Sequence, residues 1–408
     1  MARSVRATRG RDLRSGVSVW LRRGEGRDIA RPLEGDLATD VAIIGGGVSG
    51  ALIADAVLQA GRSVAVFDRR GLVKGSTPAS TALLQFEIDQ PLTLLSDRIG
   101  KAKAARAWWR SASAVNALRG RIEDLGLRCG FKERNTAYLP GNMLNLSDLK
   151  REAETRAAIG LRSRFIGRDE LAERTTVEAP GAIWSSGSAE LDPAKLVRGL
   201  WRSAAGRGAQ LHAPVDITDI DAGKRGVTLG TGDGQIIRAK ALILATGYEL
   251  APMLRPRGYS IISTWAIATK PQTRRLWPSR CLIWQAADPY LYLRTTPDGR
   301  VIAGGEDEEF EDSDKRDALI GKKTARIEKK LGALLPGIQP DAEFAWAGAF
   351  GQSSTGLPAI GAVPGAKGVY AVLGYGGNGI TFSVIAAQVL QRAILGLPDP
   401  DADLFALD

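Results

Sequence analysis

The chain has 408 residues, of which 44% are hydrophobic and 25% charged, and its formal net charge is +10. This length suggests two or three domains, and the composition is that of an ordinary globular protein whose apolar runs are too short to span a bilayer. The two cysteines lie far apart and there is a single histidine, so we expect no metal site and no histidine-based catalytic triad.

The basic residues are scattered along the chain and interleaved with acids, so we expect no nucleic-acid partner. Residues 1–35 are arginine-rich and have few apolar residues, which predicts a partly disordered basic lead-in. This segment has no apolar core long enough for a secretory signal, and it contains acids that a transit peptide would avoid. We therefore expect a cytoplasmic protein.

The first strong motif begins with an apolar run, residues 41–44, which predicts a buried strand. The run ends in Gly45, Gly47 and Gly50, at the spacing Gly-x-Gly-x-x-Gly, and a helical pattern follows. A second apolar strand then ends on Asp68. This order of strand, glycine loop, helix, strand and acid is typical of dinucleotide binding, in which the loop and the helix N-terminus hold the pyrophosphate and the acid binds the ribose hydroxyls.

The middle of the chain alternates between helical and strand patterns. Asp192 is the expected N-cap of one helix, with Pro193 in its first turn. The acidic run Glu306 to Asp314 predicts a solvated loop. Helices are expected at residues 100–125, at 147–159 and from 193 onward, and strands at 127–140, 227–229, 236–239, 241–247 and within 259–305.

A second glycine cluster, Gly374 to Gly379, lies between an apolar strand and an amphipathic helix near the end of the chain. A second helix N-terminus therefore faces a ligand. Reduced flavin carries negative charge that a helix N-terminus stabilises, whereas a nicotinamide gains nothing similar. The two glycine clusters together favour FAD over NAD.

These motifs, in this order, resemble those of the D-amino-acid oxidase, sarcosine oxidase and glycine oxidase superfamily of FAD-dependent oxidoreductases. The resemblance covers roughly residues 35–395. It rests on the opening motif, Gly75-Ser-Thr77, Ala245-Thr-Gly247, the hairpin from Tyr290 to Gly305, Gly356-Leu-Pro-Ala-Ile-Gly361 and Gly374 to Thr381.

The resemblance implies an α/β fold with two interleaved domains. A Rossmann-type FAD-binding domain, with a parallel sheet and helices, is expected at residues 36–98, 186–255 and 355–398. An antiparallel-sheet α+β substrate domain is expected at residues 99–185 and 256–354. The FAD-binding residues it implies are Gly45, Gly47, Ser49, Gly50, Asp68, Arg69, Ser76, Thr77, Val215, Ala245, Thr246, Gly247, Gly376, Gly377, Asn378, Gly379, Ile380 and Thr381.

The activity that the resemblance implies is oxidation of a C–N bond of a small amine or amino acid, with dioxygen or another electron acceptor. Covalent flavin attachment in some members uses a histidine or a late cysteine; here Ala79 stands about where the histidine would be, and Cys281 is the last cysteine, so we expect non-covalent FAD. The segment 346–355 has no arginine for a substrate carboxylate, and the strand 301–305 has no lysine to activate dioxygen. The substrate class and oxidase activity therefore stay open.

Alternation along one predicted strand supplies the substrate-site candidates. Tyr290, Tyr292 and Arg294 share a face, so two hydroxyls and a guanidinium could hold a polar or anionic substrate. A solvent-facing side of an amphipathic strand explains the same pattern equally well. Gln85 and Glu87 are weaker candidates, for which a surface strand is the simpler interpretation. Two other functions stay open: an FAD-dependent dehydrogenase of a C–OH substrate, and a non-catalytic flavin-binding or RNA-associated protein.

Overall fold

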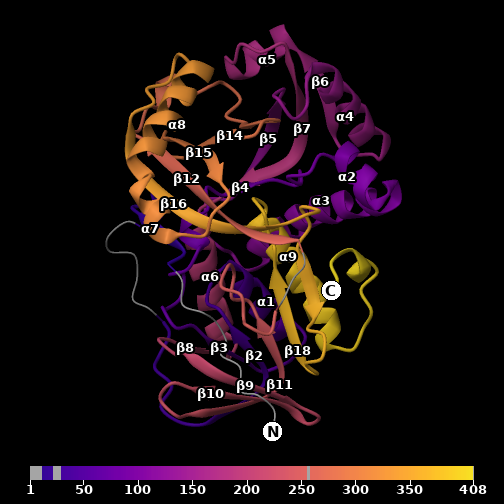
Figure 1. Cartoon of the computed structure of the whole chain (residues 1–408), viewed down its shortest axis with the longest axis vertical. Helices are drawn as coiled ribbons and strands as arrows, with labels where there is room; N and C mark the ends of the chain where they lie inside the picture. The colour runs from indigo at the N-terminus through magenta and orange to yellow at the C-terminus, as the bar shows by residue number, and fades with distance from the viewer. Residues whose placement is uncertain (1–11, 22–28, 255–257, 408) are drawn as a thin grey trace.

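Two sheets organise the molecule, and their strands come from interleaved parts of the chain (Figure 1). The computed structural model describes residues 12–21, 29–254 and 258–407. The fold is mixed α/β, with one mainly parallel and one mainly antiparallel sheet, as the sequence predicts. The parallel sheet and its helices form the lower half of Figure 1, and the antiparallel sheet forms the upper half.

The parallel sheet is built on the two apolar strands of the opening motif. Their continuous apolar runs are buried on both faces, as the centre of a parallel sheet requires. The strand order is β17 (Ala359–Ala362), β18 (Val369–Leu373), β11 (Ile236–Leu244), β2 (Leu37–Ile44), β3 (Val64–Phe67) and β8 (Gln210–His212), with β10 (Gly226–Thr231) joining β11 to β9 (Ile217–Gly223).

Strand β11 differs from the sequence prediction, which divides it in two. Residues 236–239 and 241–244 form one continuous strand. It lies parallel to β2 along nearly its whole length, and on its other edge its beginning pairs with β10 in an antiparallel hairpin while its end lies parallel to β18. One strand thus serves two pairing patterns, which a local sequence pattern does not reveal.

Three helices with apolar faces cover the parallel sheet: α1 (Val48–Gln59), α6 (Pro193–Gly206) and α9 (Gly379–Ile394). Helix α1 packs on both α6 and α9, and α3 (Lys101–Asp124) packs on α9 from the side of the second sheet. Helix α6 begins as predicted, because the Asp192 carboxylate accepts a hydrogen bond from the Lys195 N–H at 3.0 Å.

The antiparallel sheet has the order β1 (Arg14–Gly16), β16 (Ala342–Ser353), β12 (Tyr259–Thr269), β15 (Val301–Glu308), β14 (Leu291–Thr295), β13 (Leu282–Gln285), β5 (Lys132–Leu139), β7 (Gly181–Glu190) and β4 (Leu83–Leu84), with β6 (Ser163–Gly167) on β7. Its outer helices are α2 (Leu92–Ile99), α4 (Leu146–Ala158), α5 (Arg168–Thr175), α7 (Ser313–Ala318) and α8 (Ile320–Leu334), and short 3-10 turns occur at Thr77–Ala79, Thr273–Arg275 and Ala402–Leu404.

Residues 12–21 of the lead-in pack on this sheet, whereas Arg31 forms a β-bridge with His212 of the parallel sheet. Arg14–Gly16 pairs with β16, and Leu13, Val19 and Trp20 are buried. The predicted disorder is therefore not found at residues 12–21 and 29–35, and residues 1–11 and 22–28 of the lead-in lie outside the described residues. The domain boundaries stay a prediction; β4 lies in the antiparallel sheet although the sequence assigns residues 36–98 to the other half.

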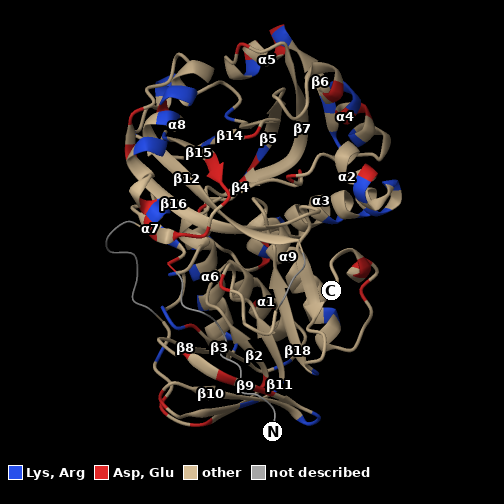
Figure 2. Ribbon diagram, viewed as in Figure 1, with Lys and Arg blue, Asp and Glu red and all other residues tan. Residues whose placement is uncertain are grey.

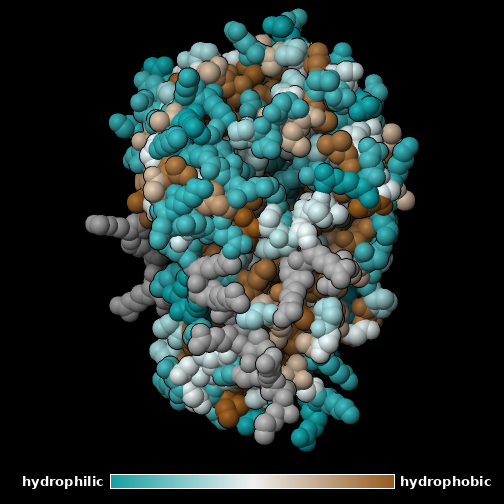
Figure 3. Space-filling model, viewed as in Figure 1, coloured by the Kyte–Doolittle hydropathy of each residue, from teal (hydrophilic) through white to brown (hydrophobic). Residues whose placement is uncertain are grey.

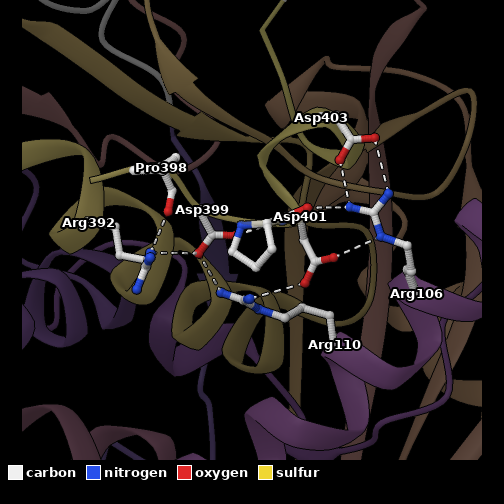
Figure 4. A network of polar contacts seen from close by, with 8 residues as sticks. Arg106, Arg110, Arg392, Pro398, Asp399, Asp401 and Asp403 are labelled. Carbon is white, nitrogen blue, oxygen red and sulfur yellow. Dashed lines mark hydrogen bonds and ion pairs between the residues drawn. The ribbon is translucent and has the colours of Figure 1, made fainter. Parts of the chain in front are cut away.

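The C-terminal segment turns back onto α3 through a network of charged side chains (Figure 4). Arg110 contacts Asp399 and Asp401 at 3.1 Å each, and Arg106 contacts Asp401 at 3.0 Å and Asp403 at 2.7 Å. Phe405, beyond this network, is buried in the core that α1 and α9 share. The segment after α9 is thus part of the packed structure.

Charged side chains cover much of the outer surface. Figure 2 shows lysines and arginines mainly on the outer helices, and Figure 3 shows hydrophilic residues over most of the visible upper half. Of the helices in residues 12–21, 29–254 and 258–407, none is long and apolar enough to cross a membrane.

Candidate active site

A cavity of about 640 Å³ runs between the two sheets. It begins at the carboxyl ends of β2 and β3, passes the N-termini of α1 and α9, and ends against β12, β13, β14 and β15 of the antiparallel sheet. Ligands of open α/β sheets bind at this end of the strands. The volume lies in the range of about 300–1,000 Å³ that is usual for ligand and cofactor pockets.

The loop after β2 and the first turn of α1 each have one position that admits only glycine. A Cβ on Gly45 would lie 2.2 Å from the carbonyl oxygen of Ala245, and the φ of Gly45 is +122°. A Cβ on Gly50 would lie 1.9 Å from the carbonyl oxygen of Gly45. The first glycine thus allows the loop to approach β11, and the last allows α1 to pack against the loop.

Asp68, at the end of β3, ties the glycine loop to the next turn. Its Oδ2 accepts a hydrogen bond from the Gly46 N–H at 2.7 Å, and its Oδ1 accepts from the N–H groups of Arg70 at 2.8 Å and Gly71 at 3.0 Å. The carboxylate also lines the cavity. Beside it, Arg69 and Arg70 both pair with the buried Glu249.

The N-terminus of α1 is held by the turn at Thr77. The Thr77 hydroxyl accepts a hydrogen bond from the Val48 N–H at 3.0 Å, and the Ser49 and Ser383 hydroxyls bond at 2.8 Å, which joins α1 to α9. The Ser76 hydroxyl is buried near them without a hydrogen-bond partner. A buried hydroxyl of this kind costs free energy unless a ligand completes its hydrogen bond.

The second glycine loop brings the N-terminus of α9 to the same cavity. The Asp89 carboxylate accepts a hydrogen bond from the Gly377 N–H at 2.7 Å. Asn378 and Thr381 face away from the cavity and bind the chain behind it, because their side chains donate to the carbonyls of Glu87 and Gln85 at 2.8 Å. These two bonds fix the segment before α2 against the start of α9.

Most of the residues that the sequence assigns to FAD come together along this cavity. Those that line it are Gly45, Gly47, Ser49, Asp68, Arg69, Ser76, Thr77, Val215, Ala245, Thr246, Gly247, Gly376, Gly377, Gly379 and Ile380. The exceptions are Gly50, which packs on Gly45, and Asn378 and Thr381 with the contacts described above. Gln85 also lines the cavity, whereas Glu87 is buried and accepts a hydrogen bond from Ser188 at 2.9 Å, so neither belongs to a surface strand.

Aromatic rings form the far wall of the cavity. Tyr290 and Tyr292 both line it, with ring centroids 5.4 Å apart, and Tyr138 stacks on Trp284 at 3.8 Å. Tyr292 has room to lie across β15 because it pairs with Gly304, where a Cβ would lie 2.5 Å from the tyrosine hydroxyl. Burial raises the pKa of Tyr290 and Tyr292, so both hydroxyls stay protonated and can donate hydrogen bonds.

Arg294 does not share this position, and the prediction that it meets the substrate needs correction. Its side chain is buried, extends towards β7 and does not line the cavity. The guanidinium donates to the carbonyls of Ala82 at 2.7 Å, Leu191 at 2.8 Å and Thr295 at 3.0 Å. Burial lowers the pKa of Arg294 to about 10, which leaves it charged at neutral pH. Its contacts are those of a structural cation that joins three segments.

Asp307 is a cavity residue that the sequence does not single out. It lies in β15, next to Tyr290 and Thr264, although the acidic run that begins at Glu306 predicts a solvated loop. Figure 2 shows the acidic end of β15 in the interior between the two halves. That prediction is wrong for residues 306–308, which are strand, and for Asp314, which lies in α7, and it holds for the exposed Glu309 and Glu311.

A β-bulge explains why Asp307 faces the cavity. Gly304 faces it with Tyr292, so regular alternation would turn Glu306 inward and Asp307 outward. The pairing with β12 shifts between Ser263 and Trp265, and Glu306 has a φ of +60°. One extra residue in β15 therefore turns Glu306 away from the cavity and Asp307 towards it. The only sequence signal is Gly304-Gly305 inside a strand, which indicates a bulge but not its effect.

The model of a known protein family, DAO, described as FAD dependent oxidoreductase, matches residues 40–393. The chain belongs to this family. It is therefore an FAD-dependent oxidoreductase.

Curated relatives span nearly the same length. Glycine oxidase of Geobacillus kaustophilus is 25% identical over 382 residues, which cover 86% of this chain and 93% of the relative. Gamma-glutamylputrescine oxidoreductase of Escherichia coli is 21% identical over 387 residues, which cover 91% and 86% of the two chains.

Solved structures share the fold of this oxidoreductase. The crystal structure of glycine oxidase from Geobacillus kaustophilus superposes with a TM-score of 0.75 at 21% identity and covers 91% of this chain and 99% of its own. L-amino acid deaminase from Proteus myxofaciens, in complex with anthranilate, gives a TM-score of 0.75 at 16% identity and covers 98% and 99%. At these sequence identities the structural similarity shows a shared fold alone.

Proposed function

We propose that this oxidoreductase oxidises a C–N bond of a small amine or amino acid. The observation that carries the proposal is the continuity of the cavity, which joins the glycine loop before α1 to a wall of buried tyrosines. A cofactor held at one end can therefore reach a substrate at the other. The relatives named above include a glycine oxidase and an oxidoreductase of an amine, gamma-glutamylputrescine.

The residues present fit FAD. The space beside Gly47, where a Cβ would come within 3.2 Å of the Thr77 hydroxyl, suits a pyrophosphate with its two flanking helix N-termini. Asp68 would accept hydrogen bonds from the adenosine ribose, and Val215 lies beside it on the adenine side. The free hydroxyl of Ser76 and the N-terminus of α9 would serve the remaining polar groups.

When bound, the flavin supplies the two-electron acceptor for the substrate. The C–H bond beside the nitrogen breaks with loss of a hydride, a C=N bond forms, and water then replaces the nitrogen to leave a carbonyl product and a free amine or ammonia. The chain contributes orientation and exclusion of water. Tyr290 and Tyr292 would donate hydrogen bonds to the substrate, and Tyr138 and Trp284 would close the cavity against solvent.

We further propose non-covalent FAD in a reducing compartment such as the cytoplasm. Cys129 and Cys281 are both free and buried, and burial raises the pKa of each thiol, so neither is an activated nucleophile. Ala79 offers no attachment point in the turn that follows Ser76.

The test begins with the purified protein, which should be yellow. Acid precipitation should release FAD into the supernatant, and colour that stays with the pellet would refute non-covalent binding. Amines and amino acids added without oxygen should bleach the flavin absorbance. Oxygen uptake compared with the reduction of an artificial acceptor then separates an oxidase from a dehydrogenase. Bleaching by hydroxy acids alone would refute C–N oxidation.

A further inference from the structure

The Asp307 carboxylate is buried in the cavity wall without a strong partner. Neither of its oxygens has a hydrogen bond of normal geometry, and both are shielded from solvent. The groups that face it are the hydroxyls of Tyr290 and Thr264, the Asp89 carboxylate across the cavity and, more weakly, Lys323 behind it. A buried carboxylate in such surroundings is costly unless a cation completes the site.

The cations near Asp307 bind its neighbours in the strand. Lys323, on α8, contacts Glu308 at 2.8 Å and donates to the Glu306 carbonyl at 2.6 Å, and Lys330 pairs with Glu306 at 2.5 Å. The bulge thus leaves the lysines on one face of β15 and Asp307 on the other. The Asp307 carboxylate therefore keeps its charge available to a ligand in the cavity.

The charge of the cavity wall also favours a cationic ligand at the end where Asp307 lies. Among the described residues that line the cavity, the only arginines and lysines are Arg69 and Arg70, which lie beside Asp68 at the opposite end and pair with Glu249. At the end of Asp307 the wall instead contains Asp89 and the two tyrosine rings. Buried tyrosine faces and carboxylates both stabilise a cation, and both disfavour a carboxylate.

The chemistry of amine oxidation limits which nitrogen this acid can hold. A hydride leaves the carbon only when the lone pair of the neighbouring nitrogen is free, so the reacting nitrogen must lose its proton. A carboxylate beside an ammonium group stabilises the protonated form. Asp307 is therefore suited to a second nitrogen that takes no part in the reaction.

We propose that the substrate is an amine with a second, non-reacting positive charge, as in a short diamine, and that Asp307 binds this charge. The proposal rests on the amine oxidation proposed above and names its substrate class. It excludes amino acids whose only far group is a carboxylate.

A series of substrates of equal length tests the proposal on the FAD-loaded enzyme. 1,4-Diaminobutane, butylamine and 4-aminobutanoate share a four-carbon chain and differ only in the far group, which is cationic, neutral or anionic; the three- and five-carbon series, with glycine and sarcosine, complete the panel. We expect kcat/KM for the best diamine to exceed that for its monoamine by about 10–100-fold, the effect of a charge-assisted contact. Equal or better oxidation of the monoamine or the amino acid in every series would overturn the proposal.

The matched variant is Asp307→Asn, which removes the charge and keeps the shape. We expect it to lower kcat/KM for the diamine by about 10–100-fold, mainly through KM, and that for butylamine by less than about threefold. Asp314→Asn, the same change at an exposed position of α7, should alter neither value. An equal loss for diamine and monoamine in Asp307→Asn would reduce Asp307 to a general role in the site and refute the proposal.

Binding of an inert cation separates this proposal from the proposed function. Tetramethylammonium has no free lone pair and cannot be oxidised, and its binding is followed by the perturbation of the flavin spectrum and by thermal shift. It should bind the wild type, weaken as the pH falls through about 6, the pKa to which burial raises Asp307, and be lost in Asp307→Asn. If no amine or amino acid reduces the flavin yet this pattern holds, C–N oxidation fails and the cation site stands. Binding that is unchanged in Asp307→Asn would overturn the site itself.

Discussion

The guanidinium of Arg294 lies 3.6 Å from the Glu190 carboxylate, and both side chains are about 1% exposed. With its hydrogen bonds to three backbone carbonyls, this cation joins β14 to β7 and to the chain before β4. The pair lies in the wall behind the cavity, where Glu190 also contacts Arg134 at 2.8 Å. Removal of Arg294 would therefore leave Glu190 with one cation, and it would leave three backbone carbonyls without their donor.

Arg294→Leu should therefore lower the free energy of unfolding by about 3–5 kcal/mol, because three backbone carbonyls lose their donor and a buried carboxylate loses one of its two cations. The measurement is denaturant unfolding of the FAD-loaded protein. Arg274→Leu, which changes an exposed arginine, is the control and should have little effect. A stable Arg294→Leu variant with a raised KM would restore the role in substrate binding that the sequence suggests.

FAD binding should depend on Asp68 in two ways. Asp68→Ala removes the ribose acceptor and also frees the N–H groups of Gly46, Arg70 and Gly71. A charged hydrogen bond contributes about 1.5–3 kcal/mol, so FAD affinity should fall about 10–150-fold. Equilibrium dialysis of released flavin measures this, with Asp36→Ala, an exposed acid before β2, as the control. Unchanged affinity would refute the assignment of the ribose site.

Gly50→Ala should prevent the packing of α1 on its own loop. The new methyl group would lie within 1.9 Å of a backbone oxygen that cannot move without displacing β2. We expect poor folding and no bound flavin, detected as colourless protein with a low melting temperature. Gly61→Ala provides a contrast, because its Cβ would meet nothing within 4 Å and only the positive φ of +70° opposes the change.

The stability of the protein should reflect the cost of burying Asp307. Burial raises its pKa from 3.8 to about 6, so the folded state binds a proton that the unfolded state has lost between these values. Stability therefore falls as the pH rises from about 4 to about 6, by an amount of up to about 3 kcal/mol. Asp307→Asn should raise the melting temperature above pH 6 and leave it unchanged below pH 4. A variant less stable than the wild type at pH 7 would contradict this account.

The C-terminal network should matter more through Arg110 than through Arg106. The Arg110 side chain is 15% exposed and its partner Asp399 only 3%, so Arg110→Ala leaves a buried carboxylate without this partner and should cost about 1–3 kcal/mol. Arg106 is more exposed and its ion pairs are screened by solvent, so Arg106→Ala should cost less. Thermal unfolding of both variants tests the order; the reverse order would mean that exposure does not govern this network.

Local patterns predict the cofactor half of the molecule well. The run from Val41 to Asp68 carries its own strand, turn and helix signals. Gly50 is required by its contact with Gly45, and Gly45 by its contact with Ala245 at the end of the adjacent strand. The same is true of Asp192 and Pro193, whose capping contacts are local. In contrast, the antiparallel pairing of residues 14–16 with β16 joins segments more than 300 residues apart, which no local pattern encodes.

In the antiparallel-sheet half, the alternation of side chains along a strand mispredicts two positions. Tyr290 and Tyr292 line the cavity as their spacing suggests, but the long side chain of Arg294 turns behind the wall towards the carbonyls of other segments. Gly304 pairs with Tyr292 on the cavity face, and Asp307, three residues later, reaches the same face only because of the bulge between them. Both outcomes depend on contacts between distant segments.

The bulge in β15 leaves the acid of the cavity wall insensitive to the loss of one residue. Deletion of Glu306 would restore regular pairing with β12 and place Asp307 two positions after Gly304, so its side chain would still face the cavity. An unbulged strand of the present length would instead turn Asp307 towards the lysines of α8 and put Glu306 in the wall. Either strand presents a carboxylate to the cavity, so in enzymes built on this strand the acid survives a change of length at the bulge.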